Sequence, residues 1–341
     1  MEGTIGVTDK DQWRVYRGAG EPHDGIRRLP EAPPWRRFDG EIREELSESE
    51  QLTVGTRPDA NDRARVYFPQ TDAVDMVNAA LYLRRPLLVT GKPGTGKSTL
   101  AYNVAYELGL GPVLNWPITS SSTLRDALYR YDAIGRLQDS NVPGRADSVD
   151  VGRYIRLGPV GTALVPSRRP RVLLIDELDK SNVDLPHDLL NVFEDGRFDI
   201  DELMRLPDDQ RDVSVMTADP DRRVTVSRGQ VRCAEFPFVV ITSNGERELP
   251  PPFLRRCVRL NMQSPSAETL ADIVAGHLGQ HALAEGQQLI EQFLESRDYG
   301  DLATDQLLNA IYLVTSGSRP HAETRERMIA NLFRPIGSTT G

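Results

Sequence analysis

The chain has 341 residues, of which 39% are apolar and 27% charged, and its net charge is −9. This composition is typical of a water-soluble protein with at least one hydrophobic core, and the acidic balance counts against nonspecific binding of nucleic acid. We expect a cytoplasmic protein without disulfides or a membrane segment, because no apolar stretch approaches the ~20 residues of a spanning helix and only two cysteines are present.

Residues 1–63 show no sustained helical or strand periodicity. The stretch RRLPEAPPWRRFDGEIREELSESEQ mixes prolines, a basic cluster and an acidic run, which is typical of flexible segments. We predict a flexible N-terminal arm. It is either a solvated tail or, around Trp35 and Phe38, a docking motif.

Short apolar segments alternate with amphipathic ones over residues 64–264. TDAVDMVNAALYL predicts a helix that begins at Thr71, PLLVT predicts a buried strand, and KSTLAYNVAYEL predicts a helix that ends at glycines. Four more strands are predicted in PVLNWPI, RVLLID, FPFVVITSN and CVRLNM. Strands that alternate with helices indicate a parallel sheet covered on both faces.

The strand signals stop after about residue 265. AETLADIVAGHL, GQQLIEQFLESR, TDQLLNAIYLV and ETRERMIANLF each have the spacing of an amphipathic helix. We therefore predict a separate helical domain over residues 265–341.

GKPGTGKST, residues 91–99, fits the phosphate-loop pattern G-x-x-x-x-G-K-[ST] between a predicted strand and a predicted helix. Its glycines let backbone N–H groups surround a phosphate, and the helix N-terminus adds partial positive charge. Lys97 can reach the β- and γ-phosphate oxygens, and the Ser98 hydroxyl can bind Mg²⁺. The predicted nucleotide-binding residues are Gly91, Pro93, Gly94, Thr95, Gly96, Lys97, Ser98 and Thr99.

A second polar cluster follows the predicted strand RVLLID. Asp176 and Glu177 emerge at its carboxyl end, the edge at which α/β sheets bind ligands. We predict that Asp176 holds Mg²⁺ through water and that Glu177 is the base that polarises the attacking water. An acidic surface pair without function is the alternative. Asp179 and Lys180 are expected to form a salt-bridging helix cap.

Asn244 ends the predicted strand FPFVVITSN, so we expect its amide to bind the water or the γ-phosphate beside the acidic pair. A plain Asn-Gly turn is the alternative. Arg255 and Arg256 follow a triple proline. A phosphate-loop site needs a cation for the charge that develops on the γ-phosphoryl group, and many NTPases receive this arginine from a neighbouring subunit. We expect one of the two to act in this way, unless both are ordinary surface arginines.

The sequence lacks both a metal-ligand spacing and a guanine-binding signature. The five histidines are scattered and the two cysteines have no partners, so no metal-ligand spacing is present. No N-K-x-D guanine signature follows the phosphate loop, so ATP with Mg²⁺ is favoured over GTP.

The order of these motifs resembles that of the AAA+ ATPases and, within them, the MoxR-like branch. The similarity is carried by VNAALYLRRPLLVTGKPGTGKSTLA, VLLIDELDKSNVDLPHDLLNVFEDGRF and FVVITSNGERELPPPFLRRC, and it covers roughly residues 64 to 335. It implies an α/β P-loop NTPase domain at residues 64–264, with a parallel sheet flanked by helices, and an all-α lid domain at residues 265–341. The N-terminal arm lies outside it.

The resemblance also implies nucleotide-dependent assembly into a ring, usually a hexamer, with the site at each subunit seam. On this basis Lys97 and Ser98 correspond to the phosphate-loop pair, Asp176 and Glu177 to the Walker B pair, and Asn244 to sensor 1.

Arginines complete the comparison with this family. Arg256 fits the finger of the family pattern F-L-D-R-F, but Arg255 replaces its acidic residue and Cys257 its second aromatic one, so the identity of the finger stays open. TSGSRPHAE resembles the sensor 2 segment of the lid, in which Arg319 would contact the γ-phosphate. Since the family commonly has G-A-S-P-R there, a helix-capping role for Arg319 is an equal alternative.

Two insertions also match the branch. Residues about 119–170 lie where it carries its helix-2 insert, and IRLGPVGTALV looks like a loop that faces a central pore or a partner. Residues about 199–235 include a predicted β-hairpin. Tyr67 and Phe68 lie where the family's adenine pocket begins, and we expect them to pack in the core.

The favoured hypothesis is an ATP-hydrolysing ring that remodels or matures a protein partner. MoxR-like proteins usually act with von Willebrand factor A-domain proteins, so the resemblance implies such a partner. One alternative is an ATP-gated assembly or signalling switch with slow hydrolysis. Another is a nucleic-acid-associated AAA+ motor, against which the acidic composition counts. The client, the exact number of subunits and the role of residues 1–60 are left open by the sequence.

Overall fold

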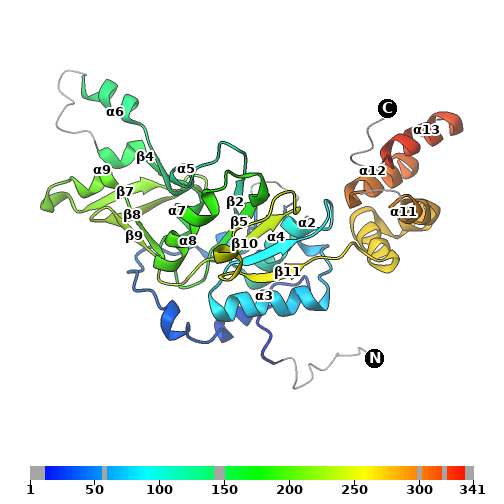
Figure 1. The fold of residues 1–341 in the computed structure, drawn as a ribbon, viewed down its shortest axis with the longest axis horizontal. Helices are drawn as coiled ribbons and strands as arrows, with labels where there is room; N and C mark the ends of the chain where they lie inside the picture. The colour runs from blue at the N-terminus through cyan, green and yellow to red at the C-terminus, as the bar shows by residue number, and fades with distance from the viewer. Residues whose placement is uncertain (1–11, 56–59, 142–149, 298–301, 317–320, 335–341) are drawn as a thin grey trace.

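A computed structural model describes residues 12–55, 60–141, 150–297, 302–316 and 321–334. Figure 1 shows a central α/β body, a second sheet on one side of it, and a group of C-terminal helices on the opposite side. Among the described residues, every helix is too short or too polar to cross a membrane.

The central sheet consists of five parallel strands. They are β1 (Leu87–Thr90), β2 (Leu114–Pro117), β5 (Val172–Asp176), β10 (Phe238–Ser243) and β11 (Val258–Asn261), in the order β11-β1-β10-β5-β2. Each coincides with a predicted strand. The three inner strands β1, β10 and β5 are almost entirely buried, as expected of strands covered on both faces, whereas the edge strands β2 and β11 also carry exposed residues. All six residues of β10 are buried. The predicted parallel sheet flanked by helices is confirmed.

Helices cover both faces of this sheet. Leu87 and Val89 of β1 pack with α3 (Thr71–Leu83) and α4 (Lys97–Leu108), whereas Leu88 belongs to the core on the opposite face. That opposite core includes residues of α8 (Leu185–Asp195) and α10 (Pro251–Leu254), while α2 (Ala60–Arg65) packs against α4. Because the strands are parallel, their carboxyl ends meet at one edge of the sheet.

Six strands form a second sheet in the order β3-β4-β7-β8-β9-β6. The predicted insert contributes β3 and β4, the predicted hairpin contributes β7 and β8, and a parallel pairing of Arg156 with Met216 joins them. The sequence did not predict this sheet, because pairing between distant segments leaves no local pattern. Its elements and connections are β3 (Tyr129–Tyr131), β4 (Ile155–Leu157), β6 (Arg197–Asp199), β7 (Asp212–Met216), β8 (Arg223–Ser227), β9 (Gln230–Arg232), α5 (Leu124–Leu128), α6 (Ala133–Ser140), α7 (Pro159–Ala163), α9 (Asp201–Met204), η4 (Val151–Tyr154) and η6 (Asp208–Gln210).

Residues 12–55 pack along the body, which corrects the predicted flexible arm for this stretch. Glu107 of α4 is 0% exposed, and its carboxylate accepts hydrogen bonds from the backbone N–H groups of residues 17–20. Arg36 is also buried and donates to the carbonyl oxygen of Arg84. The composition of the segment does not show this packing, since the groups that hold it lie on the body. The segment contains η2 (Asp24–Arg28), η3 (Pro34–Arg36) and α1 (Glu48–Gln51).

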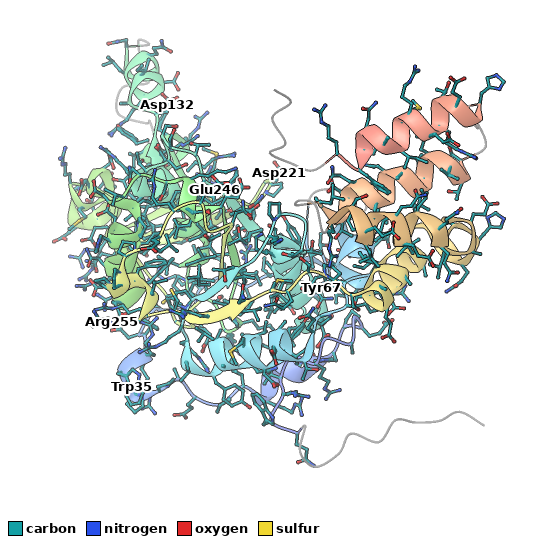
Figure 2. All side chains as sticks on the ribbon, turned by 45° about the vertical axis from the view of Figure 1, so that its right-hand side comes forward. Trp35, Tyr67, Asp132, Asp221, Glu246 and Arg255 are labelled. Carbon is teal, nitrogen blue, oxygen red and sulfur yellow. The ribbon has the colours of Figure 1, made fainter. Side chains whose placement is uncertain are left out.

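The two aromatic residues of the suggested docking motif differ in their surroundings. Phe38 stacks on Phe236, with ring centroids 5.8 Å apart. Trp35 is 73% exposed and projects from the surface in Figure 2. A docking role therefore stays a prediction for Trp35 alone. Residues 1–11 and 56–59 of the predicted arm lie outside the described residues.

The described C-terminal region consists of α11 (Ala267–Arg297), α12 (Thr304–Thr315) and α13 (Ala322–Leu332). Two of the predicted helices run together in α11, which is interrupted at Gly279, where φ is 86° and ψ is 166°. The three helices share their own core, which includes Val274, Phe293 and Ile311. The predicted helical C-terminal region is confirmed.

Candidate functional site

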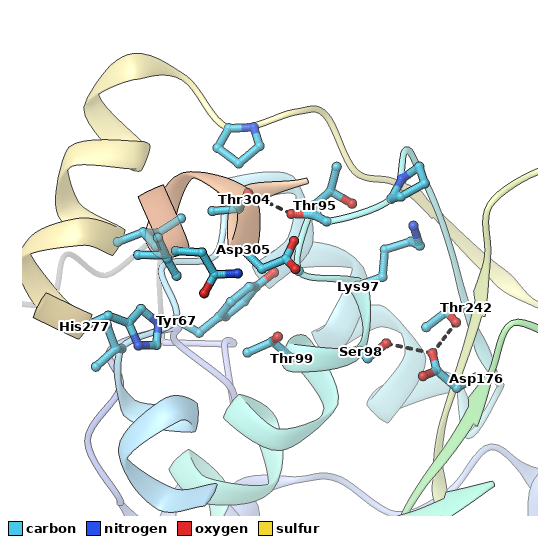
Figure 3. A pocket seen from close by; sticks show the side chains of 18 of the residues that line it. Tyr67, Thr95, Lys97, Ser98, Thr99, Asp176, Thr242, His277, Thr304 and Asp305 are labelled. Atoms are coloured by element: carbon cyan, nitrogen blue, oxygen red, sulfur yellow. Dashed lines mark hydrogen bonds between the residues drawn. The ribbon is translucent and has the colours of Figure 1, made fainter. Parts of the chain in front are cut away.

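A cavity of about 670 Å³ lies between the α/β body and the C-terminal helices. Figure 3 shows its wall on the body side, built from the segment that joins β1 to α4 and from the ends of β5 and β10. The opposite wall comes from α11 and α12. The cavity therefore occupies the carboxyl edge of the central sheet, where open α/β sheets bind ligands.

The phosphate loop, residues 91–96, requires its glycines. Gly91, Gly94 and Gly96 all have positive φ angles, of 152°, 74° and 87°. A Cβ atom on Gly94 would lie 2.5 Å from the Cα atom of Ala303, so α12 contacts the loop closely. Of the eight predicted nucleotide-binding residues in this motif, Gly91 does not line the cavity. The structure places the other seven along it, namely Pro93, Gly94, Thr95, Gly96, Lys97, Ser98 and Thr99.

Lys97 is the first residue of α4 and is only 7% exposed. Its Nζ donates hydrogen bonds to the carbonyl oxygens of Gly91 and Lys92, at 2.7 and 2.8 Å. Burial lowers the pKa of the Lys97 ammonium, and three nearby carboxylates oppose this shift. An anion beside Lys97 would relieve the cost of its burial, because the charged form would gain a partner.

Asp176, at the end of β5, accepts two hydroxyl hydrogen bonds on one oxygen. Ser98 Oγ donates to Asp176 Oδ1 at 2.7 Å, and Thr242 Oγ1 donates to the same atom at 2.6 Å (Figure 3). The described residues contain no group of three or more His, Cys, Asp or Glu side chains that could hold a metal by themselves. One carboxylate and one hydroxyl nevertheless fit Mg²⁺, which usually takes few protein oxygens and completes its shell with phosphates and water.

Glu177 has a left-handed backbone, with φ of 62° and ψ of 50°, directly after the strand. Its carboxylate has two side-chain partners. Lys180 Nζ donates to Oε2 at 2.7 Å, and Asn244 Nδ2 donates to Oε1 at 3.3 Å. The structure therefore brings the predicted base and the predicted strand-end amide together. The hydrogen bond to Glu177 raises the pKa of Lys180.

Asp179 differs from the predicted salt-bridging cap. Its side chain is 3% exposed, and its Oδ2 atom accepts hydrogen bonds from the backbone N–H groups of Asn244 and Glu246. The sequence DELDK does not predict that Asp179 is buried. Asp179 lies in η5 (Leu178–Lys180), and a single 3₁₀ turn is too short to show a periodic pattern of buried and exposed residues.

Two of the three predicted arginines, Arg255 and Arg256, lie away from the cavity. Arg256 pairs with Glu194 at 3.0 Å, and both side chains are about half exposed. Neither Arg255 nor Arg256 lines the cavity formed by the described residues, and Figure 2 shows Arg255 well apart from Tyr67 of the cavity wall. Arg319 lies outside the described residues.

The C-terminal helices supply contacts that the sequence did not predict. Thr304, the first residue of α12, donates from Oγ1 to the carbonyl oxygen of Gly94 at 2.8 Å. Asp305 and His277 line the cavity with Tyr67 (Figure 3). A motif search cannot find these residues, since their meeting depends on how the two parts pack. Core packing was expected for Tyr67 and Phe68. Tyr67 packs against the core of the body, whereas the expectation is wrong for Phe68, which is 47% exposed.

A family model described as AAA domain (dynein-related subfamily) matches residues 86–257. This span contains the phosphate loop, the acidic pair, Asn244 and both exposed arginines. A crystal structure of NtrX from Brucella abortus in complex with ADP is similar, with a TM-score of 0.35 and 13% identity. The similarity covers 81% of this chain, which spans 55% of the NtrX chain. No curated protein matches.

Proposed function

This chain belongs to the dynein-related subfamily of AAA domains, and on that premise we propose that it hydrolyses ATP with Mg²⁺ to remodel or mature a protein partner. The products are ADP and phosphate, and water is the nucleophile. The proposal assigns nucleotide binding to the phosphate loop, Mg²⁺ binding to Ser98 and Asp176, and proton transfer to Glu177.

Each of the five central side chains has a distinct role in this proposal. Lys97 exchanges its two loop carbonyls for β- and γ-phosphate oxygens, because an ammonium pairs more strongly with an anion. Glu177 accepts a proton from the attacking water, and Asn244 orients that water or the γ-phosphate. Ser98 and Asp176 present the hydroxyl and carboxylate oxygens that would hold Mg²⁺. When bound, this ion neutralises charge on the phosphates.

One observation carries the proposal above all, namely that three segments far apart in the chain converge at one cavity. Ser98, in the first turn of α4 directly after the phosphate loop, is bonded to Asp176 of β5, and Asn244 after β10 is bonded to Glu177. A glycine-rich turn with an unrelated lysine would have no reason to bring its serine to a carboxylate at a strand end.

A ring is part of the proposal because the site lacks an arginine from its own described residues. Arg255 and Arg256 follow α10 on the surface, away from the cavity. An arginine in such a place can serve the site of a neighbouring subunit, where it stabilises the charge on the γ-phosphoryl group. A hexameric ring and a von Willebrand factor A-domain client are the specific forms that we propose, on the resemblance to the MoxR-like branch.

A second candidate is a nucleotide-gated switch with slow hydrolysis. The ion pair between Lys180 and Glu177 favours it, because a base held by an ammonium is less available to water. A steady-state assay at increasing protein concentration separates the two candidates. A specific activity that rises with concentration and with a partner supports the motor, and negligible turnover supports the switch.

Mixing two inactive variants tests the shared site. K97A and R256A should each hydrolyse ATP slowly, whereas their mixture should recover activity, since roughly a quarter of the seams in a random ring combine an intact loop with an intact arginine. R255A, mixed in the same way, identifies which arginine acts. R223A, which changes an exposed arginine of β8, is the matched control and should keep full activity. If neither mixture recovers activity, each chain works alone and the ring proposal is wrong.

A further inference from the structure

Asp179 is a buried carboxylate beside the proposed site whose two oxygens differ in their surroundings. Oδ2 accepts hydrogen bonds from Asn244 N and Glu246 N, at 2.9 and 3.0 Å. Oδ1 is buried and has no hydrogen-bond partner among the described residues. An incompletely paired carboxylate is costly to bury, so its presence calls for a reason.

The two donors belong to the turn that follows β10. The strand ends at Ser243, so the N–H groups of Asn244 and Glu246 have no sheet partner. Gly245, between them, has a φ of 80° and donates its own N–H to Ser243 Oγ at 3.0 Å. The turn is therefore built around the Asp179 carboxylate, which supplies the acceptor that its backbone would otherwise lack.

This turn sets the place of the Asn244 amide. Asn244 Nδ2 reaches Glu177 Oε1 at 3.3 Å, and Glu177 lies two residues before Asp179. A shift of the turn would move the amide relative to the predicted base. Since displacements of about 1 Å can cost roughly 100-fold in rate, a device that fixes this spacing matters for hydrolysis.

We propose that Asp179 is a positioning residue, which holds the Asn244–Glu246 turn by hydrogen-bond acceptance and so keeps Asn244 in register with Glu177. The inference rests on the proposed ATP hydrolysis and adds a residue to it. In this role Asp179 does not contact the nucleotide. The turn depends on its hydrogen-bond acceptor and not on its negative charge.

A competing role follows from the charge. Asp179 is one of the three carboxylates that favour the charged form of Lys97, so it could act on nucleotide binding instead. Replacing Asp179 by asparagine separates the two roles. The amide oxygen can accept both N–H groups, but the negative charge is lost.

The experiment compares D179A and D179N in the full chain, with kcat, the KM for ATP and the melting temperature measured for each. We expect kcat of D179A to fall by roughly 100-fold with little change in KM, and D179N to restore most of it. T162V is the matched control, because buried Thr162 likewise accepts a backbone hydrogen bond, from Ala218 N at 2.9 Å, away from the cavity. It should lower the melting temperature and leave kcat unchanged.

Two results would overturn the inference. If D179N is as slow as D179A, the charge and not the acceptor is used. If D179A keeps its kcat, the carboxylate only supports the fold. Should D179A fail to fold, D179S carries the same prediction, since its hydroxyl is too short to reach both N–H groups. E177Q is assayed alongside to distinguish failure of the Asp179 inference from failure of the proposed function. Full turnover by E177Q would refute the hydrolytic mechanism itself.

Discussion

Ser98 and Asp176 are 78 residues apart in the chain, yet Ser98 Oγ donates a hydrogen bond to Asp176 Oδ1 at 2.7 Å. Asp176 also accepts from Thr242, so one carboxylate joins the phosphate loop to two neighbouring strand ends. This contact places the two predicted magnesium-binding residues side by side.

The contact leads to a prediction about magnesium. D176N keeps an oxygen for both hydroxyl donors but loses the negative charge. If Asp176 holds the ion through water, we expect the Mg²⁺ concentration at half-maximal ATPase activity to rise roughly 10- to 100-fold. A magnesium titration at saturating ATP measures it. D188N, which removes an exposed charge on α8, should behave like the wild type, and an unchanged midpoint in D176N would exclude Asp176 from the ion's surroundings.

The lowered pKa of Lys97 predicts a dependence on pH. As pH rises, Lys97 of the folded chain loses its proton at a lower pH than Lys97 of the unfolded chain, whose pKa is the ordinary 10.5. Between the lowered value and 10.5 the unfolded chain therefore binds more protons, so the free energy of unfolding increases as pH rises through this window. Urea unfolding at several alkaline pH values checks this, with K97M as the variant in which the contribution disappears.

Nucleotide binding should reverse this shift, because the triphosphate gives the Lys97 ammonium an anionic partner. At alkaline pH, ATP binding should then be accompanied by proton uptake. Calorimetry in two buffers of different ionisation enthalpy measures this uptake. Equal binding enthalpies in both buffers would show that Lys97 does not change its protonation.

The conformation and close packing of Gly94 predict that any side chain at this position of the phosphate loop weakens ATP binding. Its φ is 74°, and a Cβ atom would lie 2.5 Å from Ala303 Cα, a backbone atom that cannot move freely. We expect G94A to weaken ATP binding by roughly tenfold or more. A fluorescence titration with labelled nucleotide measures the affinity.

G109A is the matched control for this glycine. Gly109 also has a positive φ, of 58°, but the nearest atom to its Cβ would be Nη1 of Arg169 at 3.4 Å, the end of a flexible side chain. It should lose about 1 kcal/mol of stability and keep its affinity for ATP. Equal affinities in the two variants would mean that the contact with α12 is unimportant for binding.

The hydrogen bonds of Glu107 predict that removal of its carboxylate lowers the stability of the packed N-terminal segment. E107A would leave the four N–H groups of residues 17–20 without their carboxylate acceptor, so we expect a loss of about 3 kcal/mol in the free energy of unfolding. Urea unfolding measures it. E21A, which breaks an exposed pair with Arg65, should change stability by less than about 1 kcal/mol. If E107A loses no more free energy of unfolding than E21A, the segment is held only weakly and the prediction of a flexible arm is supported.

The central fold could be predicted because its signals are local. A buried parallel strand such as FVVITS, in β10, is mostly apolar, with polar residues only at its carboxyl end, and the phosphate loop needs glycines and a lysine at set positions. The second sheet could not be predicted in the same way. It depends on the pairing of Arg156 with Met216, two residues that share no pattern.

The same limit applies to the site. Asp176 and Glu177 were visible as polar residues at the end of an apolar run. Thr304 was not, because its hydrogen bond to Gly94 depends on the packing of α12 against the body. The prediction of a flexible arm failed for a similar reason, since the acceptor that holds residues 17–20 is Glu107, on another helix.

Glu177 provides the most direct test of the account, because the account makes its carboxylate the acceptor of the water proton. In E177Q the amide keeps the shape of the side chain but cannot take up that proton. ATP turnover and ATP affinity should be measured on the same preparation. The account predicts that turnover falls by at least about 100-fold while affinity stays within a few-fold of the wild type. Turnover in E177Q equal to that of the wild type would contradict it.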